Sequence, residues 1–142
     1  MNANVQNRLT DAGLLMIRLI LAAVFIYHGG QKLFGWFDGF GLHATAGFLA
    51  GLHIPYPLVA AILSGATEFF GGVILLVGTG TRLAAVPMAF NMAVACLTVH
   101  LYKGFGAQAG GMEYPLTLGV VLVALILLGP GRITLGRLIP RR

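Results

Sequence analysis

Residues 13–34 read GLLMIRLILAAVFIYHGGQKLF and form the longest apolar segment near the start of the chain. A helix of ~20 apolar residues spans the ~30 Å hydrocarbon core of a bilayer, and this stretch is long and apolar enough to do so. It nevertheless carries three ionisable side chains, Arg18, His28 and Lys32. The sequence therefore predicts a membrane-spanning helix that presents a polar face to the rest of the protein.

Three further stretches have the same character, at about residues 57–77, 82–103 and 113–129. The last is the shortest, and its Gly129-Pro130-Gly131 sequence predicts a sharp end. Together with residues 13–34, these stretches predict an all-α membrane protein, a bundle of four transmembrane helices. No repeat or linker interrupts the chain, so residues 1–142 are expected to form a single integral membrane domain.

The composition of the 142-residue chain agrees with this reading, because 58% of its residues are hydrophobic and only 9% are charged. An ordinary soluble domain is roughly 25% charged. So little polar surface excludes a disordered chain, a disulfide scaffold and a nucleic-acid-binding protein. The net charge of +5 therefore indicates contact with membrane lipids, whose anionic head groups attract Lys and Arg.

The segment between the first two spans, residues 35–56, is rich in glycine and aromatic residues. Its many glycines argue against a crossing helix, and aromatic side chains favour the membrane–water interface. We therefore expect a short interfacial or re-entrant segment here. Its aromatic residues are Trp36, Phe37, Phe40, Phe48 and Tyr56.

The basic residues predict the orientation in the membrane. Four crossings place both termini on one side, and Lys32 and Lys103 fall on the other side. Because Lys and Arg gather on the cytoplasmic side, we expect both termini to be cytoplasmic, in the cytoplasmic (inner) membrane of a bacterium. The residues on the terminal side are Arg8, Arg18, Arg82, Arg132, Arg137, Arg141 and Arg142.

Glu68 lies near the middle of the second span, where a charge facing lipid is costly. It must therefore face the interior, and by depth Arg18 is its nearest cation, so we expect a Glu68–Arg18 ion pair. Such a pair is often purely structural. Alternatively, Glu68, His28 and His100 are proton-handling or ligand-binding groups in a polar pocket that opens outward. The ionisable residues expected in the outer third are His28, Lys32, His100, Lys103 and Glu113.

The third span also carries Met88, Met92, Cys96 and His100 at intervals of four residues. Thioether, thiol and imidazole together suit Cu(I), although methionines at this spacing more often pack in a core. His28 and His100 as axial ligands of a haem are a further alternative. Since Cys96 is the only cysteine, we expect it to be dispensable to any redox activity. No catalytic motif is evident.

Five short motifs, in order along the chain, resemble the DoxX family of small membrane proteins. They are RLILAAVFIYHGGQKL (18–33), TEFFGGVILLVGTGTRLAA (67–85), His100 with KGF (103–105), GGMEYPL (110–116) and GPGR (129–132). The resemblance implies a four-helix bundle and redox chemistry at the membrane. The positions that match the polar pattern of the family are Arg18, His28, Lys32, Glu68, Arg82, His100 and Glu113.

The leading hypothesis from sequence is a membrane subunit of a quinone-linked oxidoreductase system. Glu68, His28 and His100 are its expected catalytic residues: either histidine donates to a quinone carbonyl, and Glu68 exchanges protons. Electrons are expected from a partner protein or a small reductant, and a homo-oligomer is a further possible assembly. The rival hypothesis is a non-catalytic assembly, structural or solute-handling membrane protein. The expected quinone-binding residues are His28, His100, Arg18, Lys32 and Glu113.

Overall fold

The computed structural model describes residues 2–138, and every regular element in that part of the chain is helical. A π-helical turn, Cys96–His100, continues α4, and short 3-10 turns at Leu101–Lys103 and Ala107–Ala109 follow it. The α-helices are α1 (Ala3–Phe34), α2 (Gly41–Gly51), α3 (Pro57–Val77), α4 (Thr81–Ala95), α5 (Glu113–Leu128) and α6 (Leu135–Leu138).

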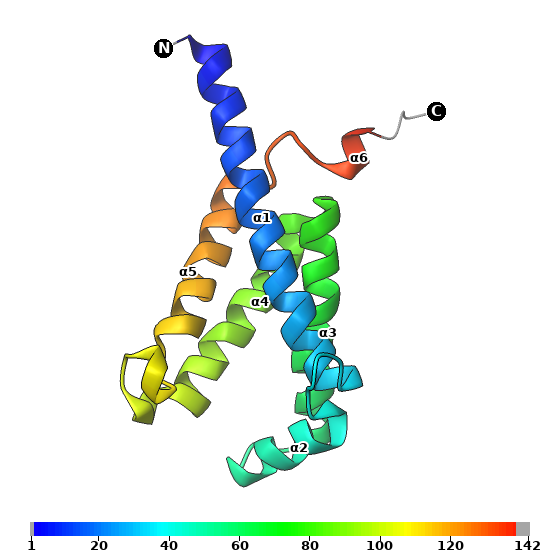
Figure 1. Cartoon of the computed structure of the whole chain (residues 1–142), viewed down its shortest axis with the longest axis vertical. Coiled ribbons are helices and arrows are strands. Elements are labelled where there is room, and N and C mark those ends of the chain that lie inside the picture. The colour runs from blue at the N-terminus through cyan, green and yellow to red at the C-terminus, as the bar shows by residue number, and fades with distance from the viewer. Residues whose placement is uncertain (1, 139–142) are drawn as a thin grey trace.

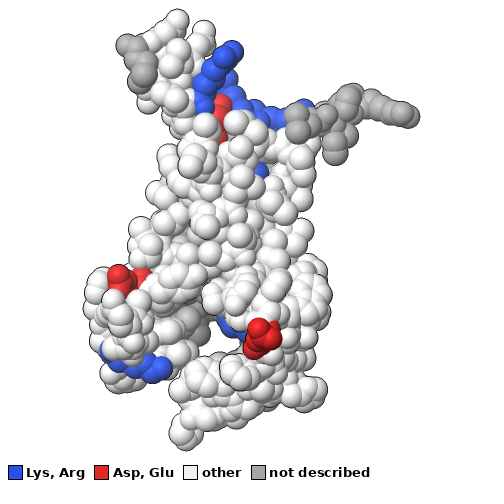
Figure 2. All heavy atoms as spheres, in the orientation of Figure 1, with Lys and Arg blue, Asp and Glu red and all other residues white. Residues whose placement is uncertain are grey.

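Three of the helical segments are long and apolar enough to cross a membrane: α1, α3, and α4 with its continuation to Lys103. The fourth, α5, is a shorter apolar helix of 16 residues. Figure 2 shows that charged side chains gather toward the two ends of the molecule and leave a band without charge between them. The chain thus forms a small helical membrane protein.

The two ends of the molecule differ. One end, called the terminal end here, holds the start of α1 and the short helix α6. Because α1 already starts at Ala3, it projects beyond the other helices (Figure 1). The opposite, distal end holds α2, which has 11 residues, none of them buried. At ~1.5 Å per residue α2 is only ~16 Å long, too short to cross a bilayer. The predicted short segment between the first two long helices is therefore a helix.

Glycines allow α1 and α3 to pack closely. A Cβ at Gly29 would collide with the backbone of Phe69, and one at Gly72 would collide with Ile26 on α1. Small residues at such contacts let two helices approach in a membrane, where the hydrophobic effect does not hold helices together. These contacts fix α1 and α3 as one pair, and α4 packs mainly along α5 as a second pair.

The buried core lies in the terminal half of the molecule, where α1, α3, α4 and α5 all contribute to it. Its centre is Phe25 of α1, Leu75 of α3, Met88 of α4 and Leu122 of α5, each 0–1% exposed. In the distal half the pairs α1–α3 and α4–α5 diverge, as Figure 1 shows. The distal half is therefore where space for a ligand is to be expected.

Arg18 stabilises the terminal end and is not the partner of Glu68, so the predicted ion pair is wrong. The guanidinium is buried and donates to the backbone oxygens of Leu75 at 3.0 Å, Pro130 at 2.9 Å and Ile133 at 2.7 Å. The last turn of a helix leaves carbonyls without intrahelical donors, and a cation satisfies them favourably. Arg18 thus ties the end of α3 to the loop that follows α5.

Candidate functional site

Glu68 lies at the centre of a buried polar cluster in the distal half. Its Oε1 accepts from Lys32 Nζ at 2.5 Å and from Asn91 Nδ2 at 3.0 Å, and only 2% of its surface is exposed. The cluster joins α1, α3 and α4. Glu68 thus faces the protein interior, as predicted, but its cation is Lys32.

The antiparallel register of α1 and α3 explains this choice of partner. Gly65 of α3 contacts Leu33 of α1, and Gly72 contacts Ile26. Later residues of α3 therefore lie beside earlier residues of α1. Glu68 therefore lies opposite the last turns of α1. Arg18 is fourteen positions before Lys32, which is ~21 Å along a helix and out of reach. Depth counted from the span ends could not reveal this register.

The second oxygen of Glu68, Oε2, is buried without a hydrogen-bond partner among the described residues. A buried carboxylate oxygen without a donor is costly, so it marks a place where a proton, a water molecule or a ligand group is stabilised. His28 is one turn before Lys32 on the same face of α1, and its ring lies 6.1 Å from that of Tyr114 on α5. His28 thus adjoins the cluster from the side of α5.

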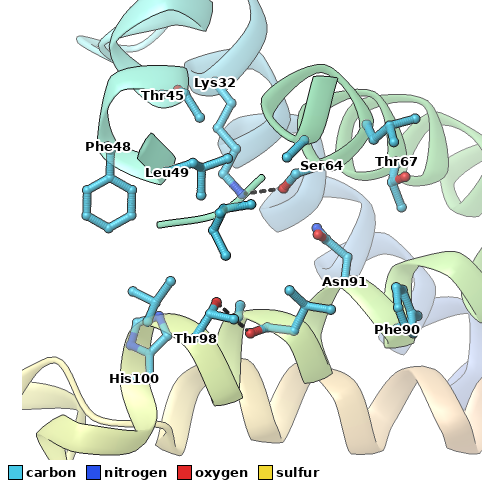
Figure 3. A pocket seen from close by; sticks show the side chains of 16 residues that line it. Lys32, Thr45, Phe48, Leu49, Ser64, Thr67, Phe90, Asn91, Thr98 and His100 are labelled. Atoms are coloured by element: carbon cyan, nitrogen blue, oxygen red, sulfur yellow. Dashed lines mark hydrogen bonds between the residues drawn. The ribbon is translucent and has the colours of Figure 1, made fainter. Parts of the chain in front are cut away.

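A cavity of about 460 Å³ opens next to this cluster, between α2, α3 and the distal part of α4. Its walls are mainly apolar, and Figure 3 shows Lys32 entering from α1 and His100 lying on the opposite wall. Lys32 Nζ also contacts Ser64 Oγ at 3.4 Å. The other polar side chains that line the cavity are Thr45, Thr67, Asn91 and Thr98.

A second recess, of about 540 Å³, adjoins the cavity and shares Lys32, Thr45 and Phe48 with it. It lies between the end of α1 and α2, and its wall includes Asp38. The space-filling view shows the distal end hollowed (Figure 2). A ligand in the cavity thus has a route past α2.

The π-helical turn determines where His100 points. One extra residue in a turn rotates all following side chains by roughly 100° relative to an α-helix, and such turns are frequent at functional sites. His100 lines the cavity, and its Nδ1 donates to the backbone oxygen of Gly110 at 2.6 Å. A neutral imidazole has one N–H, so Nε2 is left as an acceptor. The expected donation from neutral His100 to a quinone carbonyl therefore does not fit this geometry.

The other residues of the alternative copper site, Met88, Met92 and Cys96, face elsewhere. Met88 packs against Gly71 of α3, whereas Met92 and Cys96 line an apolar groove of about 250 Å³ between α4 and α5. The four side chains therefore do not converge on one site with His100. Within residues 2–138 there is no group of three or more His, Cys, Asp or Glu side chains that could hold a metal ion.

Three predicted binding residues do not line the cavity: His28, Arg18 and Glu113. Arg18 is at the terminal end, and Glu113 Oε2 accepts from the backbone N–H of Ala107 at 2.8 Å, which orders the loop before α5. Conversely, sequence reasoning missed Asn91 as a site residue. An asparagine in an apolar span is costly unless it is paired, and this was the available signal.

Comparisons with known proteins agree with these features. The DoxX family model matches residues 13–101. The uncharacterised membrane protein Rv3486 of Mycobacterium tuberculosis is 31% identical over 138 residues, covering 90% of this chain and 82% of its own length. The inner membrane protein YphA of Escherichia coli is 29% identical over 129 residues, covering 87% and 88%.

A third relative is named for an activity: "Putative oxidoreductase CatD" of Bacillus subtilis is 29% identical over 119 residues, covering 84% of this chain and 82% of its own length. No solved structure shows significant similarity. The match to the family model extends over more than half of the chain, from the first turns of the bundle to the π-helical turn. This chain belongs to the DoxX family of membrane proteins.

Proposed function

We propose that this protein is the membrane subunit of a quinone-linked redox system and that the cavity beside Lys32 holds the quinone ring. The observation that carries the proposal is the cavity itself. The cavity has a volume of about 460 Å³. Its walls are mainly apolar but include a few polar side chains, with Lys32 and His100 on opposite sides. Ligand cavities are typically ~300–1,000 Å³, mostly apolar, with a few placed polar groups that fix orientation.

The residues around the cavity fit such a ring. An ammonium group has three N–H donors, and Lys32 directs two of them at Glu68 and Ser64, which leaves one for a ring oxygen. Glu68 holds Lys32 in place. The protons that accompany quinone reduction then pass through Glu68, whose Oε2 has no donor among the described residues. His28 is the next proton-handling group on α1.

The name of one relative supports the reaction class. CatD of Bacillus subtilis is named as an oxidoreductase, although its name gives neither donor nor acceptor. In our proposal the electrons reach the cavity from a partner protein or a small reductant, and Cys96 takes no part. Cys96 lies in the apolar groove between α4 and α5, away from the residues that line the cavity.

We further propose that α5 is a fourth crossing and that both termini are cytoplasmic. The terminal end of the molecule carries Arg8 in the first turns of α1, Arg82 at the start of α4, Arg132 after α5 and Arg137 in α6. Lys32 and Lys103 are at the distal end. This asymmetry favours a cytoplasmic terminal end. Arg141 and Arg142, which enter the same argument, lie outside the described residues. The cavity then opens toward the outer leaflet, with α2 at the interface.

The test is a lipid extract and a visible spectrum of the purified protein, followed by binding of a short-chain benzoquinone. We expect quinone in the extract and at least tenfold weaker binding by Lys32→Met. Lys103→Met is the matched control, because Lys103 is at the same end but does not line the cavity. Absence of quinone and of binding would favour the non-catalytic alternative. A Soret band would favour haem, and stoichiometric copper would favour a copper protein.

A further inference from the structure

Three polar side chains that line the cavity already donate their only available proton to a backbone oxygen. Thr45 Oγ1 donates to the backbone oxygen of Gly41 at 2.8 Å, and Thr98 Oγ1 donates to that of Val94 at 2.8 Å. His100 Nδ1 donates to the oxygen of Gly110. A hydroxyl or neutral imidazole has a single proton to donate, so each group can offer the cavity only a lone pair.

Thr98 and His100 lie together on the α4 side of the cavity (Figure 3). Toward the cavity these two side chains therefore accept hydrogen bonds but do not donate them, whereas Lys32 and the second amide N–H of Asn91, which can donate, lie beside Glu68. Lys32, on the opposite side, has a free donor and accepts none. The two sides of the cavity thus differ in hydrogen-bonding character, and a ligand that spans it needs an acceptor at Lys32 and a donor at His100.

A quinone does not meet this requirement, because both of its oxygens only accept. With one oxygen at Lys32, the other would meet the lone pair of His100 Nε2. A hydroquinone carries O–H groups that both donate and accept, so it satisfies both sides at once. An ammonium donor would be repelled by the nearby positive charge of Lys32.

We propose that the cavity selects the reduced form of its ligand, a hydroquinone whose O–H donates to His100 Nε2. This inference rests on the proposed function. The second ring oxygen accepts from Lys32. The cavity therefore holds the reduced ring, which is the product of the proposed reduction, more tightly than the quinone, and His100 is the residue that distinguishes the two forms.

The experiment compares binding of a short-chain benzoquinone, its hydroquinone and the dimethyl ether of that hydroquinone. The purified protein is kept without oxygen at about pH 8, where ordinary imidazoles are neutral. The ether keeps the ring but has no O–H. We expect the hydroquinone to bind about tenfold more tightly than either other ligand, because an unmatched buried acceptor costs about this factor.

His100→Asn separates the role of Nε2 from the structural role of Nδ1. The amide nitrogen of Asn overlaps Nδ1 and can still donate to Gly110, but nothing replaces Nε2. We expect this variant to bind all three ligands with similar affinity. The matched control is His43→Asn, which changes an exposed histidine of α2 that does not line the cavity and should keep the preference.

The outcomes distinguish this inference from the function on which it rests. Equal binding of hydroquinone and quinone by the unaltered protein, or tighter binding of quinone, overturns the inference and leaves the quinone site standing. A preference that survives in folded His100→Asn also overturns it. If none of the three ligands binds, the proposed function itself fails. The comparison with the ether needs no variant, so the test remains decisive if His100→Asn does not fold.

Discussion

Replacing Lys32 by Met tests the polar cluster by removing its cation. The change removes the short hydrogen bond of 2.5 Å to Glu68 Oε1. Glu68 would keep only Asn91 as a donor, and Oε2 would still have none among the described residues. The carboxylate would then be a buried charge without a cation.

The expected cost follows from burial. Removing one partner of a buried ion pair typically costs ~3–5 kcal/mol. Here the side chain of Lys32 is 32% exposed while that of Glu68 is 2% exposed, so we expect the lower end, about 3 kcal/mol of unfolding free energy. Glu68→Gln should cost less, because Lys32 can still be hydrated and the amide still accepts from Asn91. Glu68→Ala should cost more than Glu68→Gln, because it removes the acceptor of both partners.

The double variant Lys32→Met/Glu68→Gln gives the decisive comparison. With neither charge present, the cluster becomes a neutral amide pair, and we expect a loss of only about 1 kcal/mol. Denaturing-detergent titrations followed by circular dichroism would give the four unfolding free energies. A coupling of at least about 2 kcal/mol between the two changes is expected, because the two single costs together exceed that of the double variant by this amount or more. Additive costs would refute the claim that Lys32 is the cation on which Glu68 depends.

Three more predictions concern other parts of the molecule. Arg18→Ala should destabilise the protein by more than about 3 kcal/mol, because several buried carbonyls lose a charged donor. Arg18→Lys should restore only part of this stability, because an ammonium lacks the planar fork of the guanidinium. The same detergent titration measures both variants. Cysteines placed at Asp38 and Gln108 should be labelled from outside intact cells while reporters fused after the last residue stay cytoplasmic, and the opposite pattern would invert the proposed orientation. Cys96→Ala should keep quinone-linked turnover, and a mixed disulfide trapped at Cys96 would instead indicate thiol exchange.

Much of the fold could be predicted from hydropathy alone. Runs of apolar residues about as long as a bilayer is thick set the positions of α1, α3, α4 and α5. A segment rich in glycine and aromatic residues separates the first two of these helices. The start of α1 at Ala3 could not be predicted this way, because residues before Gly13 are polar and a helix that projects from the membrane leaves no hydropathy signal.

The site was less predictable, because it depends on register and on one irregular turn. Whether Glu68 meets Arg18 or Lys32 is decided by how α1 slides along α3, which the glycine contacts fix. Likewise, His100 shares a four-residue spacing with Met92 and Cys96 in sequence, yet the π-helical turn directs it to a different cavity. Neither feature changes the hydropathy pattern.

The uneven placement of the core has a consequence for how this protein tolerates change. Its packing is concentrated at the terminal end, where Arg18 also closes the bundle, while the cavity occupies the distal half between two diverging helix pairs. Substitutions of Thr45, Phe48 or Thr98 alter the shape of the pocket without touching the packed layer that keeps the chain folded. Natural variation can therefore retune which molecule is bound while the scaffold stays intact, so relatives with this fold are free to differ in ligand.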